Sequence, residues 1–398
     1  MIVVLRLAVS LFIAQAGFHA YTAALPLALA RGGTSDATIG LIMGSAALVQ
    51  IPAALVGGRL VDRFGGVRLL WAGGIAYLLA TGILLLPGVE AGGPVGPFVV
   101  VRVLQGVGIG TVVPAALSLV PRLLPEARHG SGLAYVGAAQ NLTLVVMPPL
   151  SIAILDAASL RGVAASVVGL VAIGLLLAVR LPVRPMPRST APVADAVRRR
   201  YGFTFHRSWS VPLAIVVLYV AHWGAVTAYL PVRAFEANAD IGLYFAADGI
   251  SIFLMRLPSG WLIERVSART LIVAGAAMTG VAIGLLLVPL TTPLLVASGL
   301  LGGAGGALVL TPILVALSRR STDADRGSAF ALFSGGLATA MTLGSIGGAP
   351  IVVLLGLPSA LGLGIVLIGA AIALTLSDAS LRQVGGGAGR AAAAAVAT

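Results

Sequence analysis

Residues 58–68 read Gly58-Arg59-Leu60-Val61-Asp62-Arg63-Phe64-Gly65-Gly66-Val67-Arg68, a short charged segment between two long apolar runs. A second copy of this region follows 202 residues later. Residues 39–87 align with residues 241–289 without a gap, and 15 of the 49 positions are identical. The charged corner repeats at the same place, because the Asp-Arg pair of the first copy aligns with Glu264-Arg265. The chain therefore contains an internal duplication of an apolar unit.

The composition is that of a membrane protein. Hydrophobic residues make up 59% of the 398 residues, charged residues make up 10%, and the mean hydropathy is +1.06. A soluble domain carries about a quarter of charged residues. The apolar runs have the length of about 20 residues that a helix needs to cross the hydrocarbon core. They lack the strict alternation of barrel strands, so we predict an all-α polytopic membrane protein.

The apolar runs predict twelve spans. They cover residues 5–30, 38–61, 68–87, 95–120, 130–155, 162–181, 211–235, 240–263, 269–290, 294–318, 327–354 and 358–377. The predicted domains are an N-terminal six-helix bundle (1–181), a cytoplasmic linker loop (182–209), a C-terminal six-helix bundle (210–378) and a disordered cytoplasmic tail (379–398). Two bundles of equal orientation imply a pseudo-twofold axis along the membrane normal.

The arginines set the expected orientation. The net charge is +12, and all 25 basic residues are arginine. With both termini in the cytoplasm, 20 arginines fall on the inner side, three fall outside (Arg31, Arg161, Arg233) and two lie within spans (Arg102, Arg256). Basic inner loops set topology. We therefore expect lipid rather than nucleic acid as the partner, in a multi-pass protein of the cytoplasmic (inner) membrane of a bacterium.

The two charged corners resemble a known family. Gly58-x-Leu60-x-Asp62-Arg63-x-Gly65 resembles the signature loop of the major facilitator superfamily, and Gly260-x-Leu262-x-Glu264-Arg265 resembles its second-half copy. The resemblance covers nearly the whole chain and is closest to drug/proton antiporters. It implies two rocking six-helix bundles, in which Asp62 and Glu264 brace helix N-termini of the opposite half as a latch. The latch candidates are Gly58, Asp62, Arg63, Gly65, Arg68, Gly260, Glu264 and Arg265.

Charged and amide side chains inside the spans are candidates for proton coupling. Arg102-x-x-Gln105-Gly106-x-Gly108 resembles an element of the proton-coupled members of the superfamily. Asp248 is the only acidic residue well inside a span. Such residues normally face protein or water and mark ion pathways. We predict that Arg102, Gln105 and Asp248 couple transport to protons; a fixed structural ion pair is the alternative for Asp248.

The resemblance also implies that spans 1, 4, 7 and 10 line a central cavity. This would place Gln15, His19, Tyr21, His222 and Trp223 around the substrate. The alternative for each histidine is a packed residue with an interhelical hydrogen bond. Two histidines without a suitably spaced carboxylate predict no metal site.

These observations predict a secondary active transporter of a small organic solute. We expect alternating access, proton-coupled efflux, a monomer, no cofactor besides the proton gradient as energy source, and no enzyme activity. Proton-coupled uptake of a sugar or metabolite is the first alternative, and a non-transporting sensor or assembly subunit with the same fold is the second. The Gly-Pro pair of exporters is absent from the fifth span, which reads Gly137-Ala138-Ala139-Gln140-Asn141.

Overall fold

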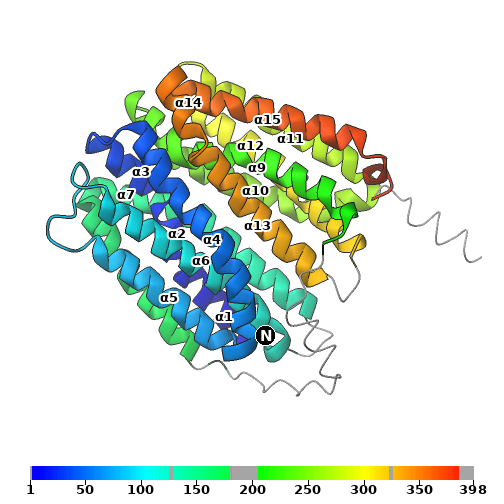
Figure 1. The fold of residues 1–398 in the computed structure, drawn as a ribbon, viewed down its shortest axis with the longest axis horizontal. Helices are drawn as coiled ribbons and strands as arrows, with labels where there is room; N and C mark the ends of the chain where they lie inside the picture. Colours follow the sequence, from blue (N-terminus) through cyan, green and yellow to red (C-terminus); the bar gives the residue numbers. More distant parts are fainter. Residues whose placement is uncertain (1, 125–128, 180, 182–204, 322–325, 385–398) are drawn as a thin grey trace, which may run out of the picture.

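The structure is a computed structural model that describes residues 2–124, 129–179, 181, 205–321 and 326–384. These residues are almost entirely helical and contain no β-strand. The helices lie side by side in two groups, one from the first half of the chain, blue to teal, and one from the second half, green to red (Figure 1).

The first group begins with three short helices that follow one another with single residues between them. Those residues, Gln15 and Ala20, keep right-handed helical dihedral angles, so the three helices form one crossing. The helices of this half are α1 (Ile2–Ala14), α2 (Ala16–His19), α3 (Tyr21–Arg31), α4 (Asp36–Phe64), α5 (Gly66–Ile83), α6 (Gly96–Leu123) and α7 (His129–Val179).

The second group has the same succession of long helices. Its elements are η2 (Arg207–Trp209), α9 (Ser210–Glu236), α10 (Ile241–Arg265), α11 (Ala268–Leu287), α12 (Thr292–Arg319), α13 (Arg326–Ser345), α14 (Gly348–Leu355), α15 (Leu357–Ser377) and η3 (Ala379–Arg382).

Ten segments of the described residues are apolar and long enough to cross a membrane. One of them, Tyr135–Val179, contains two crossings, because the backbone of α7 leaves the helical region at Ala158 and Ser159. The 25-residue helix α10 adds another crossing of sufficient length. In the described part of the chain the predicted twelve crossings are therefore confirmed, as two bundles of six.

The sequence duplication reappears in the helix packing. A Cβ atom added to Gly106 of α6 would overlap the carbonyl oxygen of Ala46 in α4. A Cβ atom added to Gly303 of α12 would overlap the carbonyl oxygen of Asp248 in α10. Ala46 and Asp248 are aligned positions of the 202-residue repeat. The pairs α4/α6 and α10/α12 thus approach each other through equivalent glycines, which is how small residues bring membrane helices together.

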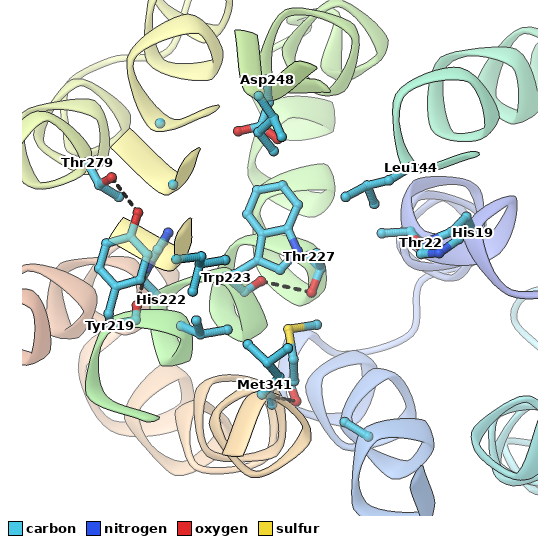
Figure 2. Close-up of a pocket in the computed structure, with 18 of the residues that line it drawn as sticks. His19, Thr22, Leu144, Tyr219, His222, Trp223, Thr227, Asp248, Thr279 and Met341 are labelled. Atoms are coloured by element: carbon cyan, nitrogen blue, oxygen red, sulfur yellow. Dashed lines mark hydrogen bonds between the residues drawn. The ribbon is translucent and has the colours of Figure 1, made fainter. Parts of the chain in front are cut away.

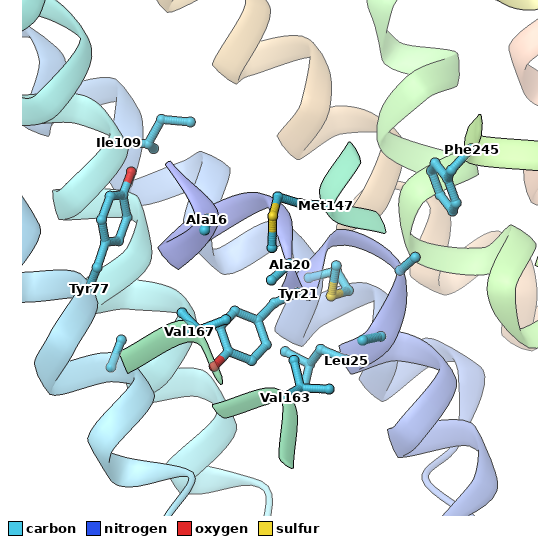
Figure 3. Packing of buried hydrophobic residues seen from close by; sticks show 14 of the residues in the cluster. Ala16, Ala20, Tyr21, Leu25, Tyr77, Ile109, Met147, Val163, Val167 and Phe245 are labelled. Atoms are coloured by element: carbon cyan, nitrogen blue, oxygen red, sulfur yellow. The ribbon is translucent and has the colours of Figure 1, made fainter. Parts of the chain in front are cut away.

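The two halves meet closely near the end of the molecule that holds Arg31. There a Cβ atom on Gly40 of α4 would overlap the ring of Tyr229 in α9. One buried cluster includes side chains of both halves, and Figure 3 shows Tyr21 and Tyr77 of the first half and Phe245 of the second among them. The core is thus continuous between the bundles at this end.

Two predicted boundaries need correction. The tail was predicted to be disordered from residue 379, but η3 and the residues up to Val384 are ordered: Leu381 is fully buried, and the amide of Ala268 donates to the carbonyl of Val384 at 2.7 Å. The end of the predicted linker forms η2, with Trp209 fully buried. Burial of Leu381 and Trp209 outweighs the polar composition around them. Residues 182–204 and 385–398 lie outside the described residues.

One arginine holds these two segments together. The indole of Trp209 donates to the carbonyl of Arg320 at 3.1 Å, and Arg320 donates to the carbonyl of Ser208, to the hydroxyl of Ser380 and, at 3.1 Å, to the carboxylate of Asp378. Burial alone would raise the pKa of Asp378, but hydrogen bonds from Ser380 and Arg320 and the arginine charge hold it below its usual value. We call these five residues the Arg320 brace.

Candidate substrate cavity

A cavity of about 280 Å³ lies between the two halves. Its wall is mostly apolar, and Figure 2 shows side chains from both halves that reach into it. The polar and aromatic residues of the wall are Phe18, His19, Thr22, Gln50, Arg102, Tyr219, His222, Trp223, Thr227, Tyr244, Asp248, Arg256, Thr279, Ser298 and Ser345. They come from the first, fourth, seventh and tenth crossings, as the resemblance implies, and also from α4, α10, α11 and α13.

Arg102 is the main charge on the first-half wall. The side chain is 4% exposed; it donates to Gln105 Oε1 at 2.8 Å and to the carbonyl of Met43 at 3.0 Å, and it lies over the ring of Phe18 at 5.1 Å. Its Nε atom has no hydrogen-bond partner among the described residues, and no carboxylate there forms an ion pair with it. Arg102 is therefore a buried cation held only by neutral groups.

His19 stands beside this guanidinium on the first crossing. Its ring packs edge-on against Phe18, with 5.2 Å between ring centroids, and neither ring nitrogen has a hydrogen-bond partner in the described part of the chain. Gln15 and Tyr21 are also buried, but neither lines the cavity. Tyr21 lies in the core of the first half (Figure 3). The expected placement of Gln15 and Tyr21 around the substrate is therefore wrong.

Asp248 is the only carboxylate among the described residues of the wall. The residue is 3% exposed, and no hydrogen bond or ion pair links it to another described residue. Its backbone packs against Gly299 and Gly303 of α12, where a Cβ atom would be too close. Arg256 follows eight residues later on α10, about 12 Å along the helix axis, and also lines the cavity.

Aromatic residues surround Asp248 on the second-half wall. Trp223 and Asp248 reach into the same space in Figure 2, and Trp223 packs edge-on against Phe245 at 6.1 Å. The hydroxyl of Tyr219 is hydrogen-bonded to that of Thr279 at 2.7 Å, and the His222 ring contacts the carbonyl of Tyr219. On the second-half wall, the carboxylate of Asp248 thus shares the cavity with several aromatic rings.

The latch candidates lie at the opposite end from Arg31. Gly65 joins α4 to α5 with φ of 87°, a conformation that favours glycine. The second copy of this corner instead caps α11 with Ser267, whose Oγ accepts from the amide of Thr270 at 3.3 Å. The surroundings of Gly58 and Gly260 and the side chain of Asp62 lie outside what the structure describes, so the predicted contact of Asp62 with α13 stays a prediction.

The other latch residues are described, and no ion pair links them to the described residues of the opposite half. Glu264 and Arg63 are exposed, and no hydrogen bond or ion pair joins Glu264 to the described residues of α7. Arg63 lies over Phe64 and Arg265 over Trp261, each on its own helix, and Arg68 is exposed at the start of α5. The side chains at the start of α7, against which Glu264 is predicted to brace, lie outside the described residues, so this contact also stays a prediction.

An ion pair lies at the other end of the halves. Arg31 of α3 pairs with Asp156 of α7 at 2.7 Å, and its guanidinium lies 5.9 Å from the ring centroid of Phe235 in α9. The first contact stays within the first half, whereas the second crosses to the other bundle. Arg31 thus connects the bundles on the side where they pack closely.

Two six-helix bundles around a central cavity define a secondary transporter. A profile described as Major Facilitator Superfamily matches residues 7–240 and 233–393. The chain belongs to the major facilitator superfamily, whose members are transporters and not enzymes.

Relatives with sequence similarity carry names of the same kind. The chain is 30% identical over 158 residues to an uncharacterized MFS-type transporter of Mycobacterium tuberculosis, with 39% of this chain and 26% of the relative covered. It is 29% identical over 125 residues (30% and 27%) to an MFS-type transporter of Rattus norvegicus, and 36% identical over 84 residues (21% and 15%) to an efflux pump of Aspergillus terreus. The matches span between 15% and 27% of these relatives.

Solved structures show the same fold. The peptide transporter POT in complex with alafosfalin has a TM-score of 0.72 at 17% identity and covers 94% of this chain and 92% of that one. The nucleoside transporter NupG has a TM-score of 0.72 at 14% identity, with 95% and 99% covered. At these identities the likeness defines the architecture alone.

Sequence reasoning did not find Tyr219, Thr227, Tyr244 and Thr279, which also line the cavity. A polar residue in an apolar span could have signalled them. The signal is weak, because such residues also bond to their own helix, as Thr227 does with the carbonyl of Trp223 at 3.0 Å.

Proposed function

We propose that the chain is a proton-coupled exporter of a small organic solute that works as a monomer by alternating access. The observation that carries the proposal is Asp248, a buried carboxylate on the cavity wall without a partner among the described residues. An ionisable side chain inside a membrane is expensive and marks an ion or substrate pathway. Asp248 can take up a proton when the cavity faces one side and release it when the cavity faces the other.

Arg102 supplies the second part of the mechanism. It is a fixed positive charge on the opposite wall, oriented by Gln105 and the carbonyl of Met43. As the halves rock, its distance from Asp248 changes, and the electrostatic energy of the carboxylate changes with it. This supports coupling between the proton on Asp248 and the direction in which the cavity opens.

Several observations support the direction and the topology. One relative is named an efflux pump. The distribution of arginines supports both termini in the cytoplasm of a bacterium. We extend the proposal to the domain limits 1–181 and 210–378 and to the latch, in which Asp62 and Glu264 would brace the opposite half when the cavity opens outward.

The test is solute flux in proteoliposomes across a panel of metabolites and drugs, with and without an imposed pH gradient. We expect counter-directed flux that requires the gradient, with loss of that flux in Asp248→Asn. Glu90→Gln is the matched control, because Glu90 is 70% exposed and its partner among the described residues is Arg161 at the surface.

Flux in the same direction as the protons would replace export by uptake. Absence of flux for the whole panel, in protein shown to be folded, would favour the sensor alternative. Full gradient-driven flux in Asp248→Asn would contradict the assignment of Asp248.

A further inference from the structure

The cavity wall carries a positive side chain in the first half and a negative one at a related place in the second half, where Arg256 of α10 adds a further cation. Arg102 belongs to the pair α4/α6, and Asp248 belongs to the pair α10/α12, which packs through equivalent glycines. Ala46 takes the place of Asp248 in the first half, and Gly299 takes the place of Arg102 in the second. Because a pseudo-twofold axis relates the two pairs, the positive and the negative charge face the cavity from opposite halves.

Neither charge is neutralised within the described residues. Arg102 has neutral acceptors only and an unpartnered Nε atom, and Asp248 has no hydrogen-bond or ion-pair partner. A buried charge without a counter-charge is strongly unfavourable. A bound solute that carries the missing counter-charges would relieve both.

The neighbours of each charge suit one kind of ligand group. Beside Arg102, both ring nitrogens of His19 are free of hydrogen bonds within the described residues, and the nitrogen that carries the ring proton can donate to an oxygen of an anion. Beside Asp248, Trp223 and Tyr244 offer aromatic faces, which attract ammonium groups. The rest of the wall is mainly apolar.

We propose that the cavity recognises a small amphipathic zwitterion, with its anionic group at Arg102 and His19 and its cationic group at Asp248 and Trp223. The inference rests on the proposed function, because it names the class of solute. A simple cation would leave Arg102 unpaired and be repelled by it. A simple anion would leave Asp248 unpaired.

Such a ligand spans the interface between the halves. Its anionic end contacts the first bundle and its cationic end contacts the second. A volume of about 280 Å³ lies near the lower end of pockets for small organic ligands, so one chain of carbon atoms between two charged groups fits the cavity.

The experiment measures equilibrium binding to the purified full-length protein in lipid nanodiscs. The probes are 6-aminohexanoate, 8-aminooctanoate and 11-aminoundecanoate, each compared with the amine and the carboxylate of the same chain length. We expect at least one zwitterion to bind about tenfold or more tightly than both single-charge analogues, since each charge-assisted hydrogen bond contributes to affinity. Equal affinities at every length, or no binding of any probe, would overturn the proposal.

Two variants locate the two charged ends. In Arg102→Gln the zwitterion should bind no better than the amine, and in Asp248→Asn no better than the carboxylate. Arg161→Gln and Glu90→Gln remove an exposed surface pair and should leave all affinities unchanged. Thermal unfolding and gel filtration verify the fold of each variant. The assigned orientation would be contradicted if the zwitterion lost its advantage over the same analogue, the amine or the carboxylate, in both variants.

The binding measurement does not depend on transport activity. Binding needs no gradient, so a zwitterion preference without gradient-driven flux would refute only the proposed export. Gradient-driven flux without a zwitterion preference would refute only this inference.

Discussion

The helix pairs α4/α6 and α10/α12 have the same packing but different charged residues on the cavity wall. In both pairs a glycine on the later helix packs against a backbone carbonyl on the earlier one, Gly106 on Ala46 and Gly303 on Asp248. The first pair carries Arg102 on the cavity wall, and the second carries Asp248 and Arg256. The duplication therefore preserved the backbone contacts between the paired helices, whereas the charged residues that line the cavity differ between the two halves.

Adding an acid to the first half, at the position equivalent to Asp248, should have the largest effect on transport. Ala46→Asp would put a carboxylate on α4 one turn from Met43, whose carbonyl Arg102 already contacts at 3.0 Å. We expect the new acid to pair with Arg102 and to reduce gradient-driven flux by about tenfold or more, because a buried ion pair is hard to separate. Proteoliposome flux is the measurement. Ala46→Asn has the same size without the charge, and an equal loss in both variants would show that size alone matters.

The equivalent glycines should be equally sensitive. Gly106→Ala and Gly303→Ala each force a Cβ atom onto a backbone carbonyl, and we expect each to destabilise the protein by about 1–3 kcal/mol through overpacking. Thermal unfolding in nanodiscs measures the effect. Gly284→Ala and Gly369→Ala are controls, because no atom lies within 4 Å of the added Cβ. If only one of the two substitutions destabilised the protein, the packing of the two helix pairs would not be equivalent.

The Arg320 brace distinguishes the second half from the first. Leu123 occupies the position in the first half that corresponds to Arg320. Arg320→Gln should weaken the hydrogen bond to Asp378 and lower the free energy of unfolding by about 1–3 kcal/mol, the range of bonds to charged groups. Thermal unfolding again measures it. Leu123→Ala is the reference variant. It changes a half-buried apolar residue at the equivalent position, so its loss of unfolding free energy should not depend on pH.

Acidification tests the same brace. The pKa of Asp378 is lower in the folded protein than the ordinary 3.8. Its contribution to stability is therefore complete above pH 3.8 and disappears as the pH falls through the folded-state pKa. The stability difference between the wild type and Asp378→Asn should shrink below pH 3.8. A difference that stays constant on acidification would contradict the assigned role of the carboxylate.

The smallest effect is expected at the end where the bundles touch. Arg31→Ala removes an ion pair whose side chains are 39% and 53% exposed and a contact with Phe235 across the halves. Together they contribute about 1 kcal/mol, enough to increase opening at this end several-fold. Because the chain has no cysteine, labelling of Ile152→Cys measures it: Ile152 is buried and lines a crevice together with Arg31, Asp156 and Phe235. Arg233→Ala, whose bonds stay within the second half, should not change the labelling.

The fold could be predicted from the sequence because its signals are strong and local. Apolar runs of membrane length define the crossings, and the charged corner repeated around Arg63 and Arg265 relates the halves. The break of α7 at Ala158 and Ser159 falls in the predicted gap between the fifth and sixth spans, residues 156–161.

The cavity could be predicted only in part. His19, His222 and Trp223 line the cavity, where they were expected, and Arg102 and Asp248, which were predicted for proton coupling, line it too. Isolated polar groups in apolar spans normally face protein or water. Tyr21 does not line the cavity, since two residues of helix rotate a side chain by about 200° and turn it away from the face of His19.

The small anchored segment after α15 has a practical consequence. Val384 accepts a hydrogen bond from the first residue of α11, and Leu381 is fully buried beneath it. A reporter protein fused after residue 384 would leave this anchor intact. A truncation at residue 378 would remove the buried Leu381 and the hydrogen bond to α11, and it would release Arg320 from Ser380.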